Sequence, residues 1–335
     1  MDKKIAINGF GRIGRTFFRA AHSRRLNIVA INDLTDLDTL VHLLKYDSTY
    51  GEFSGNVEIQ NGKLIIDGKE INTSSEKDPT KLGWKKLGID IVIESTGIFC
   101  DFDGAVKHLK AGAKLVIITA PAKEGKAVKT FVLGVNEKDF KSSDKVISMA
   151  SCTTNCLVPV AAVIDKYFKI KKASMNTVHS LTMDQNLQDS PHKDLRRARS
   201  ALQSIIPTTT GATIAAAKVL QQLENKMAGV SLRVPTATVS IVDFVAVVGK
   251  KTNKEEINDK FSQEAKDIKW QGALAVSDKP LVSVDFKAHP AGAIVDLPST
   301  QVIDGDLIRV LAWYDNEMGY SHRLAEFVKY LENKI

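Results

Sequence analysis

The chain has 335 residues, a length that suggests about two domains. Its composition is that of a globular protein, and no apolar run is long enough to cross a bilayer, so we expect no membrane partner. Residues 1–4 lead directly into a predicted strand without a long apolar stretch, so we expect no signal peptide. Three cysteines argue against a disulfide framework and favour a cytoplasmic location. The net charge of +7 suits an anionic ligand, whereas Lys and Arg without interleaved aromatics argue against specific nucleic-acid recognition.

The N-terminal stretch predicts a strand, a glycine-rich turn, a helix and a second strand that ends on Asp33. In the turn, Gly9 permits a tight bend, Gly11 lets a pyrophosphate approach the backbone, and Gly14 lets helix and strand pack closely. Asp33 is placed to accept hydrogen bonds from the ribose hydroxyls and to repel a 2′-phosphate. The pattern therefore predicts a dinucleotide site that favours NAD over NADP.

Further short apolar strands alternate with a helix, which predicts a doubly wound, mostly parallel sheet. We expect strands at 89–94, 114–119 and 131–135, a helix at 101–110 and an inserted hairpin within 56–72. Ligands of such sheets bind outside the carboxyl ends of the strands. Residues just past those ends are cofactor candidates, with ordinary turn residues as the alternative: Thr96, Gly97, Thr119 and Ala120.

Cys152 lies where a strand at 146–149 gives way to a helix that runs to 168. Unpaired N–H groups and the helix dipole favour negative charge there, so we expect a lowered thiol pKa and a nucleophile. The alternative is a small core residue, and for Cys156, one turn further on, we expect that core role.

The pattern then changes to longer alternating strands, which predicts an α+β domain with a large, mostly antiparallel sheet. We expect strands at 173–181, 231–234, 238–248, 281–286 and 307–314, and helices at 211–224, 254–267 and 321–333. If the last helix packs back on the first domain, residues 1–150 with 317–335 form the NAD-binding domain and residues 151–316 the catalytic domain. The charged stretch 182–204 is either a solvated cluster or an oligomer interface with an anion site.

A thiolate beside NAD suggests oxidation of an aldehyde through a covalent thiohemiacetal and then a thioester. The reaction needs a base with a pKa near neutrality, for which histidine is the usual residue. His179 ends the first strand after the Cys152 helix and so can return to the thiol, although a buried structural histidine remains the alternative.

Several stretches, in matching order and spacing, carry a resemblance to a known family. They are 7–15 (INGFGRIGR), 151–156 (SCTTNC), 191–199 (PHKDLRRAR), 233–236 (RVPT) and 313–317 (WYDNE). Over essentially its whole length the chain resembles phosphorylating glyceraldehyde-3-phosphate dehydrogenase. The resemblance implies NAD-dependent conversion of glyceraldehyde 3-phosphate to 1,3-bisphosphoglycerate.

The resemblance also implies roles for matching positions. Cys152 is similar to the nucleophile, and His179 to the base that holds the thiolate and takes the hemithioacetal proton. Inorganic phosphate is expected at Ser151, Thr153, Thr210 and Gly211, and the substrate phosphate at Thr182, Arg197 and Arg233. The cofactor is expected at Gly11, Arg12, Ile13, Asp33, Lys77, Thr119 and Asn316, without a metal. Family members are homotetramers in which the stretch 182–204 reaches the neighbour's cofactor.

Some positions depart from the family pattern. Ser190 stands where NAD-specific members usually carry Leu, a residue that helps to exclude a 2′-phosphate. We therefore expect NAD to be the cofactor, with relaxed discrimination against NADP. For Met318, in place of Trp, and Val158, in place of Ala, we expect packing changes only.

Two other functions compete with this interpretation. The related erythrose-4-phosphate dehydrogenase shares the thiol, the histidine and the stretch 204–207 (SIIP), but it lacks the Thr210-Gly211 pair that is kept here. A binding protein that uses its positive charge on RNA is the other alternative, and intact Cys152, His179 and Arg233 disfavour it.

Overall fold

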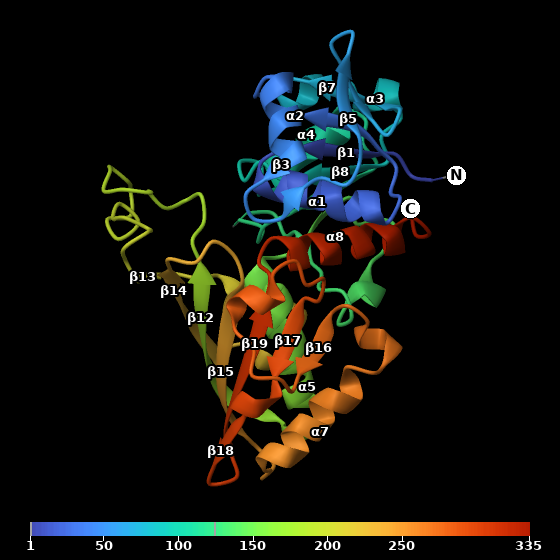
Figure 1. The fold of residues 1–335 in the computed structure, drawn as a ribbon. Coiled ribbons are helices and arrows are strands. Elements are labelled where there is room, and N and C mark those ends of the chain that lie inside the picture. The colour runs from blue at the N-terminus through green and yellow to red at the C-terminus, as the bar shows by residue number, and fades with distance from the viewer. Residues whose placement is uncertain (1, 124) are drawn as a thin grey trace. The chain divides into compact units, whose positions relative to one another are not determined.

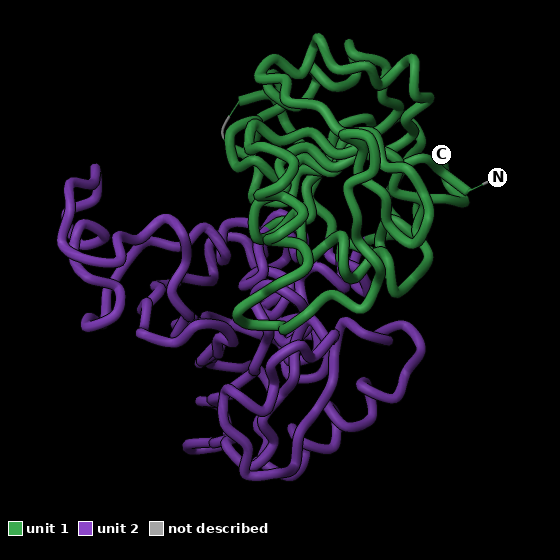
Figure 2. The backbone as a smooth tube through the Cα atoms, turned by 45° about the horizontal axis from the view of Figure 1, so that its top comes forward, with its two compact units in different colours: residues 1–131, 137–150, 324–335 green, residues 132–136, 151–323 purple. Residues whose placement is uncertain are grey.

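The computed structural model describes residues 2–123 and 125–335. They form two compact units, drawn in different colours in Figure 2. The first unit consists of Met1–Phe131, Glu137–Ala150 and Leu324–Ile335, and the second of Val132–Asn136 and Ser151–Arg323. The chain therefore enters the second unit directly before Cys152.

The first unit is built on a nine-stranded sheet among the described residues (Figure 1). In spatial order its strands are β10 (Lys129–Thr130), β11 (Val146–Ser148), β9 (Leu115–Ile118), β8 (Ile91–Glu94), β1 (Ile5–Asn8), β2 (Ile28–Asn32), β7 (Lys69–Ser74), β6 (Lys63–Ile66) and β5 (Val57–Gln60). The pairs from β10 to β7 are parallel. The central strands are buried along their whole length, as expected of parallel strands covered on both faces.

Helices and short turns connect these strands. They are α1 (Arg12–Ser23), α2 (Leu37–Lys45), α3 (Trp84–Leu87), α4 (Phe102–Lys110), η1 (Pro79–Lys81) and η2 (Glu137–Asp139), with a small ribbon of β3 (Tyr46–Asp47) and β4 (Gly51–Glu52). From β1 the chain moves outward to β2 and β7, and then crosses back to β8 and β9 on the other side. The predicted doubly wound sheet is confirmed, and its strand order reverses between β1 and β8.

The glycines between β1 and α1 have the predicted conformational roles. Gly9 has φ +90°, a region that side chains with a Cβ rarely adopt. A Cβ on Gly14 would lie 2.2 Å from the Gly9 carbonyl oxygen, so only glycine allows this helix-to-turn contact. A Cβ on Gly11 would meet nothing within 4 Å, which leaves the start of α1 open.

The predicted hairpin is confirmed as β5 and β6, with β7 pairing antiparallel to β6 and parallel to β2. The predicted strand at 131–135 is wrong. The strand in this region is β10, and Phe131 already leaves the sheet to pack its ring 5.6 Å from that of Phe327. A short apolar run does not by itself distinguish a strand from a buried turn.

The second unit is a mixed sheet with helices on it (Figure 1). In spatial order its strands are β13 (Ile206–Thr208), β14 (Met227–Val234), β12 (Ile170–Ser180), β15 (Ser240–Val248), β19 (Leu307–Tyr314), β17 (Ala293–Asp296) and β16 (Leu274–Ser277), and β18 (Gln301–Ile303) pairs with β19. Most pairs are antiparallel, as predicted, but β12–β14 and β16–β17 are parallel.

Helix α5 (Cys152–Phe168) is the centre of this unit's core, because most of its residues are buried against β15, β17 and β19. The other helices and turns are α6 (Ala212–Val219), α7 (Lys254–Glu264), η3 (Gln221–Leu223), η4 (Ile268–Trp270), η5 (Ser283–Phe286) and η6 (Leu297–Ser299). The predicted strand at 281–286 is wrong, since this segment forms η5 and exposes Val282 and Val284.

The last helix, α8 (Met318–Leu331), contains the final boundary between the units. Its residues from Leu324 onward belong to the first unit, where Arg24 binds Glu326 at 2.8 Å.

Candidate active site

The thiol of Cys152 stands at the beginning of α5. Ser151 is the N-cap residue, in extended conformation, and its Oγ accepts a hydrogen bond from Thr154 N at 3.1 Å. Cys152 is partly exposed, whereas Cys156 is fully buried and directs its Sγ to the Ala312 carbonyl. The predicted strand-to-helix position of Cys152 and the core position of Cys156 are both confirmed.

His179 lies near the end of β12, and its Nε2 is 3.5 Å from Cys152 Sγ. Its Nδ1 is 2.7 Å from the Ser180 carbonyl oxygen. A carbonyl oxygen only accepts hydrogen bonds, whereas the Arg233 guanidinium, 3.0 Å from the same Nδ1, only donates; the shorter contact with the carbonyl favours the proton on Nδ1. The lone pair of Nε2 then faces the sulfur and is free to receive its proton.

The charges of this pair differ from the sequence-based expectation. Burial raises the pKa of the Cys152 thiol and outweighs the nearby Arg233 charge and the hydrogen bonds with Thr153, so the predicted lowering of this pKa is wrong. Burial, followed by the charge of Arg233, lowers the pKa of His179 to about 4. Both directions favour a neutral thiol beside a neutral imidazole, and the pKa of His179, about 4, lies below the near-neutral pKa expected of the base.

Basic and hydroxyl side chains gather next to His179. Arg233, its register partner on β14, lies 3.0 Å from His179 Nδ1 and donates to Thr182 Oγ1 at 2.9 Å. Arg197 donates to Thr208 Oγ1 and, at 2.5 Å, to Asp184. The side chain of Thr182 also donates to Asp184. The structure thus brings together Thr182, Arg197 and Arg233, the predicted site for the substrate phosphate.

Asp184 and Tyr314 are two residues of this site to which the sequence pattern assigned no role. The Asp184 carboxylate accepts from the same Thr182 and Arg197 groups that a phosphate needs. The buried Tyr314 hydroxyl lies 2.9 Å from Thr153 Oγ1 and 2.8 Å from Thr177 Oγ1. Alternation along β19 places Tyr314 on the inner face, and this was the available signal.

The residues predicted for inorganic phosphate lie at the beginnings of two helices. Ser151 and Thr153 open α5, while Thr210 and Gly211 immediately precede α6, which packs against α5. Thr210 Oγ1 accepts from Ala212 N at 3.2 Å. N–H groups at helix beginnings are suited to bind an anion.

Asn316 is held by two buried serines. Its Oδ1 accepts from Ser180 Oγ at 2.9 Å and from Ser240 Oγ at 3.2 Å. Because the oxygen is occupied in this way, the Nδ2 group is the part of the amide that remains to donate to a ligand.

In the first unit, the predicted cofactor residues lie at the carboxyl ends of strands. Asp33 follows β2, and its carboxylate accepts from Phe10 N at 2.6 Å and Thr35 N at 2.9 Å. These bonds hold the acid beside the open start of α1 at Gly11. An anion-binding helix beginning beside a fixed carboxylate fits a pyrophosphate next to a ribose.

The remaining predicted cofactor residues surround the same end of the sheet. Arg12 and Ile13 form the first turn of α1, and the Arg12 guanidinium binds Asp47 at 2.7 Å. Lys77 is exposed after β7. Thr119 follows β9, and its Oγ1 donates to the Glu94 carbonyl at 3.0 Å.

Within residues 2–123 and 125–335, no helix is both long and apolar enough to cross a membrane. The same residues contain no group of three or more His, Cys, Asp or Glu side chains suited to hold a metal ion.

A dinucleotide-binding sheet and a separate unit that places a thiol beside an imidazole fit the class of NAD-dependent dehydrogenases. Residues 3–102 match the family described as glyceraldehyde 3-phosphate dehydrogenase, NAD binding domain, and residues 151–316 match the corresponding C-terminal domain. The chain belongs to the glyceraldehyde-3-phosphate dehydrogenase family.

Similar proteins cover the chain from end to end. The glyceraldehyde-3-phosphate dehydrogenase of Geobacillus stearothermophilus is 50% identical over 336 residues, which covers 100% of this chain and 99% of the relative. Glyceraldehyde-3-phosphate dehydrogenase 1 of Bacillus subtilis (strain 168) is 48% identical over 337 residues, with 100% and 99% covered. The glyceraldehyde-3-phosphate dehydrogenase A of Chlamydomonas reinhardtii, a chloroplastic protein, is 50% identical over 335 residues, with 99% and 89% covered.

Proposed function

We propose that this protein oxidises glyceraldehyde 3-phosphate with NAD and inorganic phosphate to give 1,3-bisphosphoglycerate. The observation that carries the proposal is the 3.5 Å contact between Cys152 Sγ and the acceptor nitrogen of His179, in a chain of this family. A thiol and a base in this relation are the two groups that thioester chemistry requires.

In the proposed mechanism, Cys152 Sγ attacks the aldehyde carbon while its proton passes to His179 Nε2. The N–H groups of the first turn of α5 stabilise the oxyanion, to which His179 returns a proton. When bound, NAD accepts the hydride of the resulting thiohemiacetal. His179 takes up the hydroxyl proton as the carbonyl forms again, which leaves a thioester on Cys152. A phosphate oxygen then attacks this thioester, and the thiolate leaves.

We assign the phosphate sites by their chemistry. Arg233, Arg197 and Thr182 hold the substrate phosphate, because guanidinium forks and hydroxyls match phosphate oxygens. The helix beginnings at Ser151, Thr153, Thr210 and Gly211 hold the attacking phosphate. In this scheme, the substrate phosphate displaces the Asp184 carboxylate from Arg197 and Thr182.

For the cofactor, we propose contacts with Gly11, Arg12, Ile13, Asp33, Lys77 and Thr119, and with Asn316 on the nicotinamide amide. We propose residues 1–150 with 317–335 as the NAD domain and residues 151–316 as the catalytic domain, although residues 132–136 and 317–323 belong to the second compact unit. The NAD-binding family match at residues 3–102 supports the first assignment.

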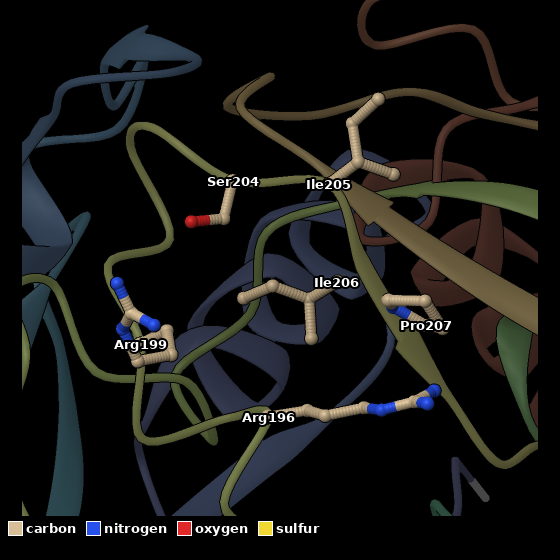
Figure 3. A pocket seen from close by; sticks show the side chains of 6 residues that line it. All are labelled: Arg196, Arg199, Ser204, Ile205, Ile206 and Pro207. Atoms are coloured by element: carbon tan, nitrogen blue, oxygen red, sulfur yellow. The ribbon is translucent and has the colours of Figure 1, made fainter.

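We also propose that the protein is a cytoplasmic homotetramer without a specific nucleic-acid partner. The stretch 182–204 and the adjacent Ile205 expose several large apolar side chains: Met183, Leu187, Leu195, Leu202 and Ile205. Next to them lies a cavity of about 380 Å³, to which the stretch contributes Arg196 and Arg199 and β13 contributes Ile206 and Pro207 (Figure 3). Exposed apolar area of this kind supports a subunit contact.

The test is a steady-state assay of NADH formation by the purified protein with glyceraldehyde 3-phosphate, with and without inorganic phosphate. We expect phosphate-dependent turnover that is lost in Cys152→Ser, whereas NAD binding stays near that of the parent. A higher kcat/KM with erythrose 4-phosphate would reject the proposed substrate. The same assay with NADP tests the effect of Ser190, and we expect NAD to give the higher kcat/KM.

A further inference from the structure

A buried polar network lies at the carboxyl ends of β1, β2 and β8, and Glu94 is its centre. Glu94 is the last residue of β8 and only 1% exposed. Buried carboxylates are expensive unless hydrogen bonds compensate for the lost water. The hydrogen-bond partners of Glu94 therefore show which segments this side chain holds in place.

Donor groups contact both oxygens of the Glu94 carboxylate. Oε1 accepts from the backbone N–H of Thr96 at 2.8 Å and from the Thr96 hydroxyl. Oε2 accepts from Asn8 Nδ2 at 2.6 Å and from His108 Nε2 at 3.0 Å. Each oxygen of this buried side chain thus has two hydrogen-bond partners.

The proton position on His108 follows from Trp84. The indole Nε1–H of Trp84 donates to His108 Nδ1 at 3.0 Å, so Nδ1 is the acceptor and Nε2 carries the proton toward Glu94. Trp84 and His108 are 1% and 0% exposed, and their position is set by the core beneath the sheet. Glu94 is thus held on one side by His108 of α4, which Trp84 of α3 orients, and on the other side it binds the backbone of Thr96.

Asn8 carries the network across β1 to β2. Its Oδ1 accepts from Asn32 Nδ2 at 2.8 Å, and Asn32 Oδ1 accepts from Ser74 Oγ at 2.8 Å and Glu76 N at 2.9 Å. Glu76 directly precedes Lys77, one of the proposed cofactor contacts. A single set of bonds therefore joins the turn after β8 to the turn after β7.

The glycine turn between β1 and α1 contacts the turn after β8, which belongs to the same hydrogen-bond network. The Ser95 hydroxyl donates to the Gly9 carbonyl at 2.7 Å, and a Cβ on Gly9 would lie 2.7 Å from Thr96 N. Any displacement of the backbone at Thr96 must therefore move the turn that leads into α1.

We infer that Glu94 is a positioning residue for the adenosine and pyrophosphate half of NAD: through Thr96, Asn8 and Asn32 it fixes the turns after β1, β7 and β8. This inference rests on the proposed cofactor contacts. It assigns Glu94 no contact with NAD and no part in the reaction at Cys152.

The test is Glu94→Gln, which keeps the side-chain shape. Whichever way the amide is turned, its NH₂ group faces donors that previously bound a carboxylate oxygen. We expect the dissociation constants of NAD and of ADP-ribose to rise by the same factor, about tenfold. At saturating NAD, kcat stays within about twofold of the parent, because the second unit is unchanged.

Glu264→Gln is the matched control. Glu264 is also a buried carboxylate, 4% exposed, which accepts from Lys166, Tyr167 and the indole of Trp270, but it lies on α7 of the second unit. We expect this variant to lower the melting temperature and leave ADP-ribose binding unchanged. If it weakens ADP-ribose binding as much as Glu94→Gln does, or if Glu94→Gln binds ADP-ribose like the parent, the inference is overturned.

Should Glu94→Gln fail to fold, His108→Phe removes one donor to Glu94 and is expected to weaken ADP-ribose binding in the same direction. Parent-like binding in a folded His108→Phe protein would contradict the inference. ADP-ribose binding does not depend on turnover. A parent protein without dehydrogenase activity would therefore reject the proposed function while leaving this test valid.

Discussion

Cys152 and His179 are 27 positions apart in the chain and 3.5 Å apart in the structure. Since the imidazole presents a lone pair to the thiol, we predict that His179→Asn slows alkylation of Cys152 by iodoacetamide at pH 7 by about 10- to 100-fold. Peptide mapping of the labelled protein measures the rate at this sulfur alone, and Cys152→Ser provides the blank. An unchanged rate would mean that His179 does not act as the base.

The positions of Cys152 and His179 could be predicted from the sequence, but the pKa values of their side chains could not. A strand, a helix and a returning strand are local patterns, so the junction at Cys152 and the strand end at His179 could be predicted. The pKa of a thiol depends on how much water the whole fold removes, and burial outweighed the helix terminus here. Tyr314 was missed for a similar reason, because its hydroxyl partners come from distant segments. Asp184 was missed because the stretch that it shares with Thr182 and Arg197 has no periodic pattern.

At the start of helix α1, one glycine is needed for packing within the protein and another leaves space for a ligand. A Cβ at Gly14 collides with the Gly9 carbonyl, whereas a Cβ at Gly11 meets no protein atom within 4 Å. We predict that Gly14→Ala destabilises the protein by about 2–4 kcal/mol, while Gly11→Ala retains parental stability and binds NAD at least tenfold more weakly. Thermal unfolding and NAD titration of both variants check this. Normal NAD affinity in Gly11→Ala would exclude a pyrophosphate at this turn.

Glu264 of helix α7 accepts hydrogen bonds from residues of α5 and η4, and these bonds make the stability of the folded protein depend on pH. Burial would raise the pKa of Glu264, but hydrogen bonds from Lys166, Tyr167 and Trp270 lower it below its ordinary value of 4.5. The stabilisation is therefore complete above about pH 4.5 and is lost as the pH falls through the folded-state pKa.

We accordingly predict that Glu264→Gln is less stable than the parent by about 1–3 kcal/mol at pH 7, and that the difference shrinks toward pH 3. Urea unfolding of both proteins at several pH values measures it. A difference that stays constant with pH would show that the carboxylate charge is not the cause.

Long periodic elements could be predicted from the sequence, and short ones could not. The strand at 307–314 agrees with β19 residue for residue, because it alternates over its whole length. The short strands β16, β17 and β18 were missed, and residues 281–286 were misassigned. A segment of so few residues is too short to show a hydrophobic periodicity. Parallel pairing of β12 with β14 depends on a crossover that local sequence does not encode.

At the scale of the whole molecule, the proposed homotetramer uses the exposed apolar side chains of 182–205 as a subunit contact. We expect Leu195→Asp and Ile205→Asp, whose side chains are 82% and 67% exposed, to dissociate the tetramer, because each would bury an unpaired charge in the proposed contact. The control is Ile268→Asp on η4, which replaces an equally exposed apolar residue, 79%, outside this stretch. Sedimentation velocity gives the mass of each species. Intact tetramers in both test variants would place the contact elsewhere.

His179 and Arg233 sit opposite each other across the parallel strands β12 and β14. Their alignment is kept by backbone hydrogen bonds between the two strands, which Leu181 and Lys226 extend at either end of the connection. We expect insertions or deletions in the exposed residues 187–191, which include none of the proposed phosphate-binding residues, to alter the proposed subunit contact and to leave the pairing of His179 with Arg233 intact. One residue added within β12 would by contrast turn the imidazole of His179, and one added within β14 the guanidinium of Arg233, to the opposite side of the sheet, and we expect either insertion to abolish activity in a single mutational step.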